Sequence, residues 1–257
     1  HPDVRRMLLT MKAFNEGNRA LTYFTAQLLD VAHLSPDETA RQDAEDLLAF
    51  LTPICKAFMT DTGLEVTNHG MQVFGGHGFI REWGMEQLVR DCRIAPIYEG
   101  TNGIQALDLL GRKVLGSQGK LLRGFTKIVH KFCAANAEHP QLASYVTQLN
   151  ALNQQWGEVT TNLGMAAMKN ADEVGAASVD YLMYSGYIIL GYLWLRMALV
   201  AQAQLDAGSA DADYCQGKLA TNEFYFKRLL PRTAAHRAAI EAGSDCLMTL
   251  PAEMFSL

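Results

Sequence analysis

Hydrophobic residues recur along the chain at steps of three, four and seven positions. At the start of the chain they are Val4, Leu8, Met11 and Phe14. This spacing gathers apolar side chains on one face of a helix and predicts an amphipathic helix over about residues 3–33. Alternating apolar and polar runs bounded by turn residues, which are typical of strands, are missing. We therefore predict an all-α protein.

Turn-forming residues divide the helical pattern into further segments. Ser35, Pro36 and Asp37 end the first helix, and a second one begins near Glu38 and runs to about Gly75. Within it, Thr52 followed by Pro53 fits a helix cap and a first helical residue, so we expect a break or a kink there. A short turn or helix is expected over residues 81–89, and Pro96 ends whatever precedes it.

Another helix is predicted after residue 101. Asn102 can cap it, and Gln105 stands three residues later, as in a capping box. The residues that follow it, Gly116 to Gly119, form a small polar linker. We place a domain boundary there, which gives a first helical domain over residues 1–116 and a second over residues 117–257.

The second domain shows four helical segments with short connections, which predicts an antiparallel four-helix bundle. The segments are residues 120–136, 141–171, 174–206 and 213–242. The run from Tyr181 to Leu195 carries no formal charge, but it is shorter than the about 20 apolar residues of a spanning helix. Its four tyrosines favour a buried bundle helix with no membrane span. A membrane-associated helical bundle is the alternative.

Composition excludes several classes of function. The 257 residues carry a net charge of −5 with no basic block, so nucleic-acid binding is not expected. Five widely spaced cysteines without a CxxC pair argue against a disulfide framework or a zinc site and fit a reducing compartment. The histidines show no metal-ligand spacing, so no metal is predicted. The chain lacks an initiator Met, and we expect it to be a fragment of a longer protein.

Two short motifs could carry chemistry. Gly75-Gly76-His77-Gly78 follows a helix, not a strand, so it is not a Rossmann fingerprint. It is either a helix C-cap or a place where the backbone approaches a ligand closely. Glu99 precedes a helix start and is either a solvated acid or a general base. For the base, we expect an apolar wall formed by Pro96, Ile97 and Tyr98.

In combination, these motifs resemble the C-terminal helical domain of the acyl-CoA dehydrogenases, which are flavoenzymes. The family pattern is Gln-x-x-Gly-Gly, then Arg-Asp, then Tyr-Glu-Gly-Thr leading into a helix. Here it reads Gln72 to Gly76, Arg90-Asp91 and Tyr98 to Thr101, and the resemblance covers about residues 3–115.

The resemblance implies roles for individual residues. Glu99 would be the catalytic base that removes the α-proton of an acyl-CoA, while Tyr98 and Gly100 would contact the substrate. The cofactor would be FAD, and a longer polar residue often stands at the position of Gly103 in the family. The FAD contacts implied are Gln72, Val73, Phe74, Gly75, Gly76, Thr101 and Gly103.

The resemblance also implies an assembly and a cellular setting. The family places two further domains before this region, so this fragment alone should be inactive. The bundle after Gly116 is similar to the extra C-terminal domain of larger bacterial members, some acting on sulfur-containing groups such as 3-methylmercaptopropionyl-CoA. We expect a homo-oligomer, at least a dimer, that passes electrons to an electron-transfer flavoprotein in fatty acid β-oxidation in the bacterial cytoplasm. The alternatives are an acyl-CoA oxidase and a helical assembly module without catalysis.

Overall fold

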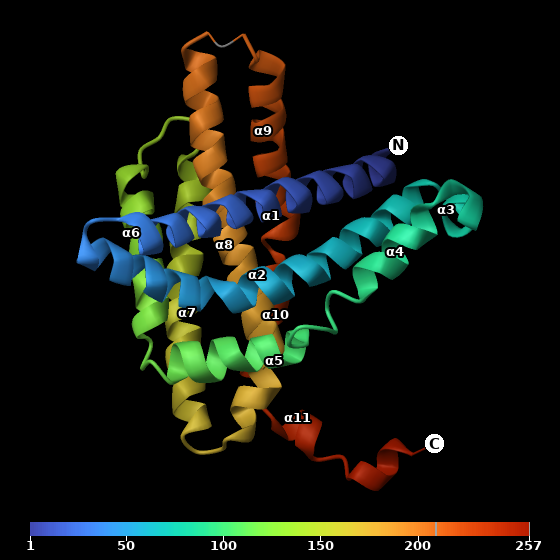
Figure 1. Cartoon of the computed structure of the whole chain (residues 1–257), viewed down its shortest axis with the longest axis vertical. Helices are drawn as coiled ribbons and strands as arrows, with labels where there is room; N and C mark the ends of the chain where they lie inside the picture. Colours follow the sequence, from blue (N-terminus) through green and yellow to red (C-terminus); the bar gives the residue numbers. More distant parts are fainter. Residues whose placement is uncertain (209, 257) are drawn as a thin grey trace.

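The computed structural model describes residues 1–208 and 210–256, and helices make up its regular structure throughout that part of the chain (Figure 1). The all-α prediction is therefore confirmed. The elements are α1 (Pro2–Leu34), α2 (Glu38–Val73), α3 (Gly76–Phe79), η1 (Arg81–Trp83), α4 (Met85–Arg93), α5 (Asn102–Leu107), η2 (Asp108–Leu115), α6 (Lys120–Ala135), α7 (Ala143–Ala167), α8 (Asp172–Asp206), α9 (Ala212–Phe224), η3 (Tyr225–Leu229), α10 (Arg232–Glu241), α11 (Asp245–Met248) and η4 (Ala252–Phe255).

Helices α1 and α2 form a long antiparallel hairpin that lies across the other helices (Figure 1). The turn between them is set by Asp37, whose carboxylate accepts the backbone N–H of Thr39 at 2.8 Å and of Ala40 at 3.3 Å. This satisfies two of the amide groups that a helix start leaves without intrahelical partners. Phe14 on α1 and Phe58 on α2 are fully buried and meet edge to face.

The predicted break at Pro53 is wrong, because α2 continues through this residue. The hydroxyl of Thr52 does not cap a new helix; it donates to the carbonyl of Leu48 at 2.7 Å. Pro53 is buried. Burial of the surrounding apolar face stabilises the helix enough to offset the missing backbone hydrogen bond, which usually costs about 3 kcal/mol.

Helix α8 is the central helix of the second half of the chain. All of the run from Tyr181 to Leu195 is buried, apart from the partly buried Met183, so the predicted buried bundle helix is confirmed. Its polar atoms have partners: the indole N–H of Trp194 donates to the Ala13 carbonyl at 3.1 Å. By length and hydropathy alone, α2 and α8 could each cross a membrane, but more than half of the most apolar window of α8 lies inside the protein.

The last predicted helix, residues 213–242, is wrong as a single element. The chain forms α9, then the π-helical turn η3, and begins α10 at Arg232 immediately after Pro231. Proline lacks the N–H that would continue the ladder, so the helix restarts with Pro231 at its N-cap. Helices α6, α7 and α8 with this broken α9–α10 segment make the predicted antiparallel bundle.

One cluster of buried apolar side chains joins the two halves of the chain. It includes Phe50 and Phe58 from α2, Leu109 from η2, and Trp156 and Tyr187 from α7 and α8. Helix α8 also packs against α1, α2 and α5. The domain boundary at residue 116 remains a prediction. The two halves nevertheless share one core, so a substitution where they meet will affect the packing of both.

Candidate functional site

The segment that carries Glu99 is a closed loop between α4 and α5. The carbonyl of Pro96 accepts the backbone N–H of Asn102 at 3.0 Å and the hydroxyl of Thr101 at 3.2 Å. These two hydrogen bonds bring the ends of the loop together. Glu99 lies between these two ends of the loop, with its side chain exposed to solvent.

Both residues in the middle of this loop have left-handed backbone conformations. Glu99 has φ 56° and Gly100 has φ 78°. A non-glycine residue in this region costs about 1–2 kcal/mol, and such strain is often found at functional sites. The positive φ favours glycine at Gly100, and a Cβ there would also displace the end of the flexible Gln105 side chain, whose nitrogen would lie 2.7 Å away. The sequence shows the Glu-Gly pair, but the positive φ at Glu99 is visible only in the structure.

The backbone N–H groups of Glu99 and Gly100 donate no hydrogen bond to any residue within 1–208 and 210–256. A free N–H beside a carboxylate can polarise a carbonyl oxygen while the carboxylate takes a proton from the neighbouring carbon. The loop therefore places hydrogen-bond donors beside an exposed carboxylate.

The apolar wall expected around Glu99 is wrong for this chain taken by itself. Pro96 is buried, but Ile97 and Tyr98 are 51% and 52% exposed. Their apolar surface faces outward from the loop, where another part of the complete protein or a substrate can cover it. The sequence pattern identified the residues but not the exposure of Ile97 and Tyr98.

The glycine cluster ends α2 and begins α3. Gly75 has φ 60° and ψ −143°, a conformation that only glycine adopts readily, and its N–H donates to the Gln72 carbonyl at 3.0 Å. Gly78 approaches the end of α2 so closely that a Cβ would lie 2.3 Å from the Met71 carbonyl oxygen. The C-cap interpretation is therefore right only in placing the end of α2 here, because the C-cap is Phe74 and Gly75 follows it with a positive φ.

The same turn also leaves room for a ligand. A Cβ on Gly75 or Gly76 would meet nothing within 4 Å, and both residues are exposed together with Gln72. An open backbone without side chains lets a flat or phosphate-bearing group approach closely. These residues thus fit the adenosine-pyrophosphate portion of FAD, with Gln72 as an additional polar group.

The predicted site residues fall into two separate groups. Tyr98, Glu99, Gly100, Thr101 and Gly103 share the loop and the start of α5. The other group lies at the far end of α2, where α3 forms the tip of an arm that projects from the rest of the molecule (Figure 1). Its members are Gln72, Val73, Phe74, Gly75 and Gly76.

The sequence analysis missed the role of Asn102. The capping box is wrong: α5 begins at Asn102, with Thr101 at the N-cap and no side-chain cap. The Asn102 side chain reaches α2 instead, where its nitrogen donates to Asp61 at 2.8 Å and its oxygen accepts from Lys56 at 2.8 Å. The available signal was a set of polar residues, Lys56, Thr60 and Asp61, on an otherwise apolar stretch of α2. Burial raises the pKa of Asp61, and the hydrogen bond from Asn102 and the charge of Lys56 oppose that shift.

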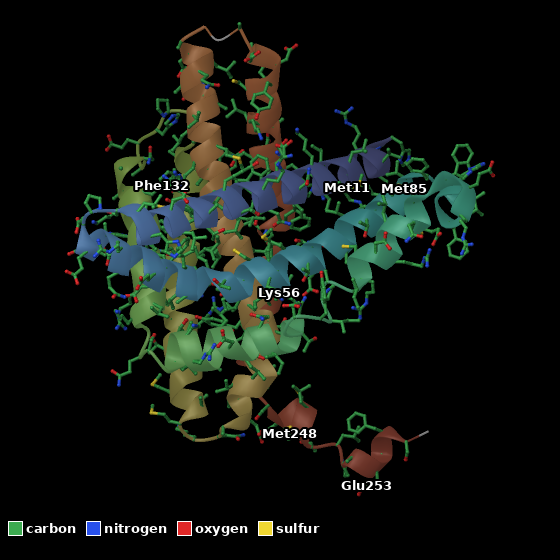
Figure 2. The ribbon with its side chains drawn as sticks, viewed as in Figure 1. Met11, Lys56, Met85, Phe132, Met248 and Glu253 are labelled. Carbon is green, nitrogen blue, oxygen red and sulfur yellow. The ribbon has the colours of Figure 1, made fainter. Side chains whose placement is uncertain are left out.

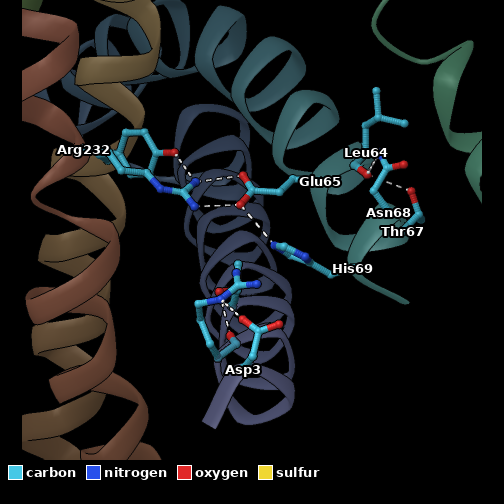
Figure 3. Close-up of polar contacts among 10 residues, drawn as sticks. Asp3, Leu64, Glu65, Thr67, Asn68, His69 and Arg232 are labelled. Carbon is cyan, nitrogen blue, oxygen red and sulfur yellow. Dashed lines mark hydrogen bonds and ion pairs between the residues drawn. The ribbon is translucent and has the colours of Figure 1, made fainter. Parts of the chain in front are cut away.

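A second polar contact joins α10 to α2. The Arg232 guanidinium donates to both carboxylate oxygens of Glu65 at 2.8 Å and to the Tyr187 hydroxyl at 3.0 Å (Figure 3). His69 lies on the other side of Glu65, with its Nε2 3.5 Å from the carboxylate. The Glu65 hydrogen bonds raise the pKa of Arg232, so this group stays charged. The ion pair holds the second bundle against the helix that leads to the glycine turn.

In the described part of the chain, no group of three or more His, Cys, Asp or Glu side chains is placed to hold a metal ion. All five cysteines are free thiols.

Comparison with protein families covers nearly the whole chain with two adjacent matches. Residues 1–115 match the acyl-CoA dehydrogenase C-terminal domain, and residues 125–251 match a family described as acetyl-CoA dehydrogenase C-terminal like.

Several curated proteins are similar over this length. The chain is 39% identical to 3-methylmercaptopropionyl-CoA dehydrogenase of Ruegeria pomeroyi over 97% of its length and 42% of the relative. It is 33% identical to a broad-specificity linear acyl-CoA dehydrogenase of Mycobacterium tuberculosis over 99% of the chain and 43% of the relative. A butyryl-CoA dehydrogenase of Syntrophomonas wolfei is 31% identical over 99% and 42%. The chain thus spans less than half of each of these relatives.

Solved structures share the fold. An acyl-CoA dehydrogenase from Bacillus anthracis complexed with FAD matches 99% of this chain and 42% of its own, with a TM-score of 0.65 and 20% identity. ACDH-11 of Caenorhabditis elegans, solved in complex with C11-CoA, matches 86% of this chain and 35% of its own, with a TM-score of 0.68 and 21% identity. With both family matches and the all-α fold in agreement, the chain belongs to the acyl-CoA dehydrogenase family.

Proposed function

We propose that this chain is the C-terminal part of an FAD-dependent acyl-CoA dehydrogenase that desaturates an acyl-CoA thioester to a trans-2-enoyl-CoA. The observation that carries the proposal is the Glu99 loop, where an exposed carboxylate stands beside unbonded backbone N–H groups in a strained conformation. The family match gives this loop its chemical context.

Each part of the loop has a task in this reaction. The Glu99 carboxylate removes the α-proton of the acyl group, and the N–H of Glu99 donates to the thioester oxygen as negative charge develops there. Tyr98 offers an exposed aromatic face to the substrate, and Gly100 keeps the approach free of side chains. Bound FAD would supply the acceptor for the hydride that leaves the β-carbon.

The proposed FAD contacts divide between the two groups of residues. Gln72 to Gly76 would hold the adenosine-pyrophosphate portion, and Thr101 with Gly103 would lie nearer the reacting end. Because α3 and the Glu99 loop lie at different ends of the arm (Figure 1), we propose a homodimer in which each chain lends its glycine turn to the other. Exposed large apolar residues on the arm, among them Phe74, Phe79 and Trp83, support such a contact.

The remaining elements of the proposal concern the cellular setting. We propose electron-transfer flavoprotein as the acceptor and fatty acid β-oxidation as the process, in line with the family. The five free cysteines support a reducing compartment, for which we propose the bacterial cytoplasm. Cell fractionation tests the compartment, and sedimentation of the complete protein tests the dimer.

The test of the activity uses the complete protein. Its visible spectrum is recorded without oxygen while a series of acyl-CoAs is added, with Glu99→Gln alongside. We expect a flavin band that bleaches in the native protein and persists in Glu99→Gln, which keeps the shape of the side chain but not its charge. A colourless protein that takes up no FAD would overturn the proposal and leave a helical assembly module. Peroxide production on readmission of oxygen would indicate an acyl-CoA oxidase.

A further inference from the structure

The Glu99 loop is closed by local hydrogen bonds that do not attach it to the rest of the protein. Tyr98 N–H donates back to the Ile94 carbonyl at 3.2 Å, and the Asn102 N–H and Thr101 hydroxyl both donate to Pro96. The loop is therefore held together as a unit, and something else must set its position relative to α2.

The Asn102 side chain is placed to do this. Its nitrogen donates to the Asp61 carboxylate at 2.8 Å, to the Thr60 hydroxyl at 3.0 Å and to the Ala57 carbonyl at 3.2 Å. Its oxygen accepts the Lys56 ammonium at 2.8 Å. All of these partners belong to α2, and Lys56 lies where α2 passes α5 (Figure 2).

The chemistry of the partners leaves one orientation for the Asn102 amide. Lys56 can only donate hydrogen bonds and an ionised Asp61 can only accept them. The amide oxygen therefore faces Lys56 and the amide nitrogen faces Asp61. Asparagine is one of the few side chains with a donor and an acceptor at this separation, so no aliphatic or purely acidic residue of similar size satisfies both.

We infer that Asn102 is a positioning residue, which sets the place of the Glu99 carboxylate relative to α2. Asn102 follows Glu99 by three residues and also closes the loop through its own N–H to Pro96. A shift of Asn102 must therefore move both ends of the loop and, with them, the base. The inference rests on the proposed role of Glu99.

The consequence for catalysis follows from how steeply proton transfer depends on distance. Displacing a reacting group by about 1 Å can slow a reaction on the order of 100-fold. Substrate binding depends on a much larger surface, so KM should change little. Loss of the Asn102 contacts should thus lower kcat far more than it raises KM.

The test uses an exchange of side chains in the complete protein. Asn102→Asp places two carboxylates against each other at the 2.8 Å contact with Asp61, which like-charge repulsion should open. Asp61→Asn leaves two amides there. The double variant Asn102→Asp with Asp61→Asn restores one carboxylate and one amide in swapped positions, and the new carboxylate faces Lys56. Asn162→Asp, the same exchange at an exposed position on α7 away from both groups of site residues, is the control.

We expect Asn102→Asp to lower kcat roughly 10- to 100-fold with KM changed less than about threefold, and the double variant to recover most of kcat. Hydrogen exchange of the peptide over residues 94–105 should be faster in the single variant and return toward the native rate in the double variant. Equal loss in both, or no loss in either, would overturn the inference. If Asn102→Asp does not fold, the double variant still tests the inference. A folded double variant with native-like kcat supports the positioning role of Asn102, and a folded double variant with low kcat contradicts that role.

Glu99→Gln separates this inference from the proposed function. If Glu99→Gln turns over acyl-CoA at the native rate, the proposed function fails whatever the Asn102 variants do. If Glu99→Gln is inactive and Asn102→Asp keeps its full kcat, the assignment of Asn102 alone fails.

Discussion

Replacing Gly186 by alanine should destabilise the protein at the place where α8 crosses α2. A Cβ built on Gly186 would lie 2.2 Å from Cδ2 and 2.4 Å from Cγ of the Phe58 ring. Ordinary contact begins at 3.4 Å, so the ring or the helix must move by 3.4 − 2.2 = 1.2 Å. Phe58 is fully buried and meets Tyr187 edge to face at 5.1 Å, so it has little room to move.

The magnitude follows from two opposing effects. Overpacking a core costs about 1–3 kcal/mol and sometimes more, and an aromatic ring without free space lies at the upper end of that range. Alanine in place of glycine within a helix stabilises by about 1 kcal/mol. We therefore expect a net loss of about 2 kcal/mol in the free energy of unfolding, from the difference of these terms.

Urea unfolding of the complete protein, followed by circular dichroism, measures this change. Gly175→Ala is the matched control, because it lies on the same helix and its Cβ would meet nothing within 4 Å. It should gain up to about 1 kcal/mol. Adding Phe58→Leu to Gly186→Ala should restore part of the loss by making space. If Gly186→Ala proved as stable as Gly175→Ala, the close crossing of the two helices would be refuted.

Three further predictions concern Arg232, Cys55 and Glu99. Arg232→Met should lower the free energy of unfolding by about 1–2 kcal/mol, because charged hydrogen bonds to Glu65 are lost, while the partial exposure of the two side chains (37% and 30%) limits the strength of these bonds. Lys227→Met, whose ion pair with Glu223 is more exposed, is the control and should give the native midpoint in urea unfolding. Burial raises the pKa of Cys55 from 9.0 to about 11, so the folded thiol stays neutral where the unfolded one ionises. The raised pKa stabilises the folded protein fully below pH 9, and this contribution is lost as the pH rises toward 11. The loss in the free energy of unfolding amounts to about 2 kcal/mol by pH 10.5. Between pH 8 and 10.5, Cys55→Ala should therefore lose less stability than the native protein, and an equal loss would contradict the raised pKa of Cys55. Glu99→Asn should be more stable to heat than Glu99→Gln, because asparagine tolerates the left-handed backbone better, although both should lack activity; equal melting temperatures would argue against strain at this residue.

Helical periodicity was sufficient to predict the all-α fold and the buried character of α8. It was insufficient at the prolines, because their effect depends on tertiary packing. Pro53 lies inside a continuous α2, where the enclosed apolar face outweighs the lost hydrogen bond, whereas Pro231 coincides with a real interruption between η3 and α10. The same residue type therefore has opposite outcomes in two helices.

For the site, sequence motifs named the residues but not their geometry. The Tyr-Glu-Gly-Thr motif identified Glu99, but its positive φ and free N–H groups arise from the loop closure at Pro96. The role of Asn102 could not be predicted, because its partners on α2 are more than 40 residues away in sequence. For the same reason, nothing in the sequence paired Arg232 with Glu65, 167 residues apart.

The central claim is that Glu99 takes the α-proton of an acyl-CoA. The most direct measurement is the uptake of deuterium at the α-carbon of an acyl-CoA incubated without oxygen in D2O with the complete protein, read by mass spectrometry. Because the Glu99 side chain is exposed in this chain, a proton that it receives can exchange with solvent. The account predicts deuterium uptake with the native protein and none above background with Glu99→Gln, at acyl-CoA concentrations that saturate both. Equal uptake with the two proteins would contradict it and assign the base to another residue.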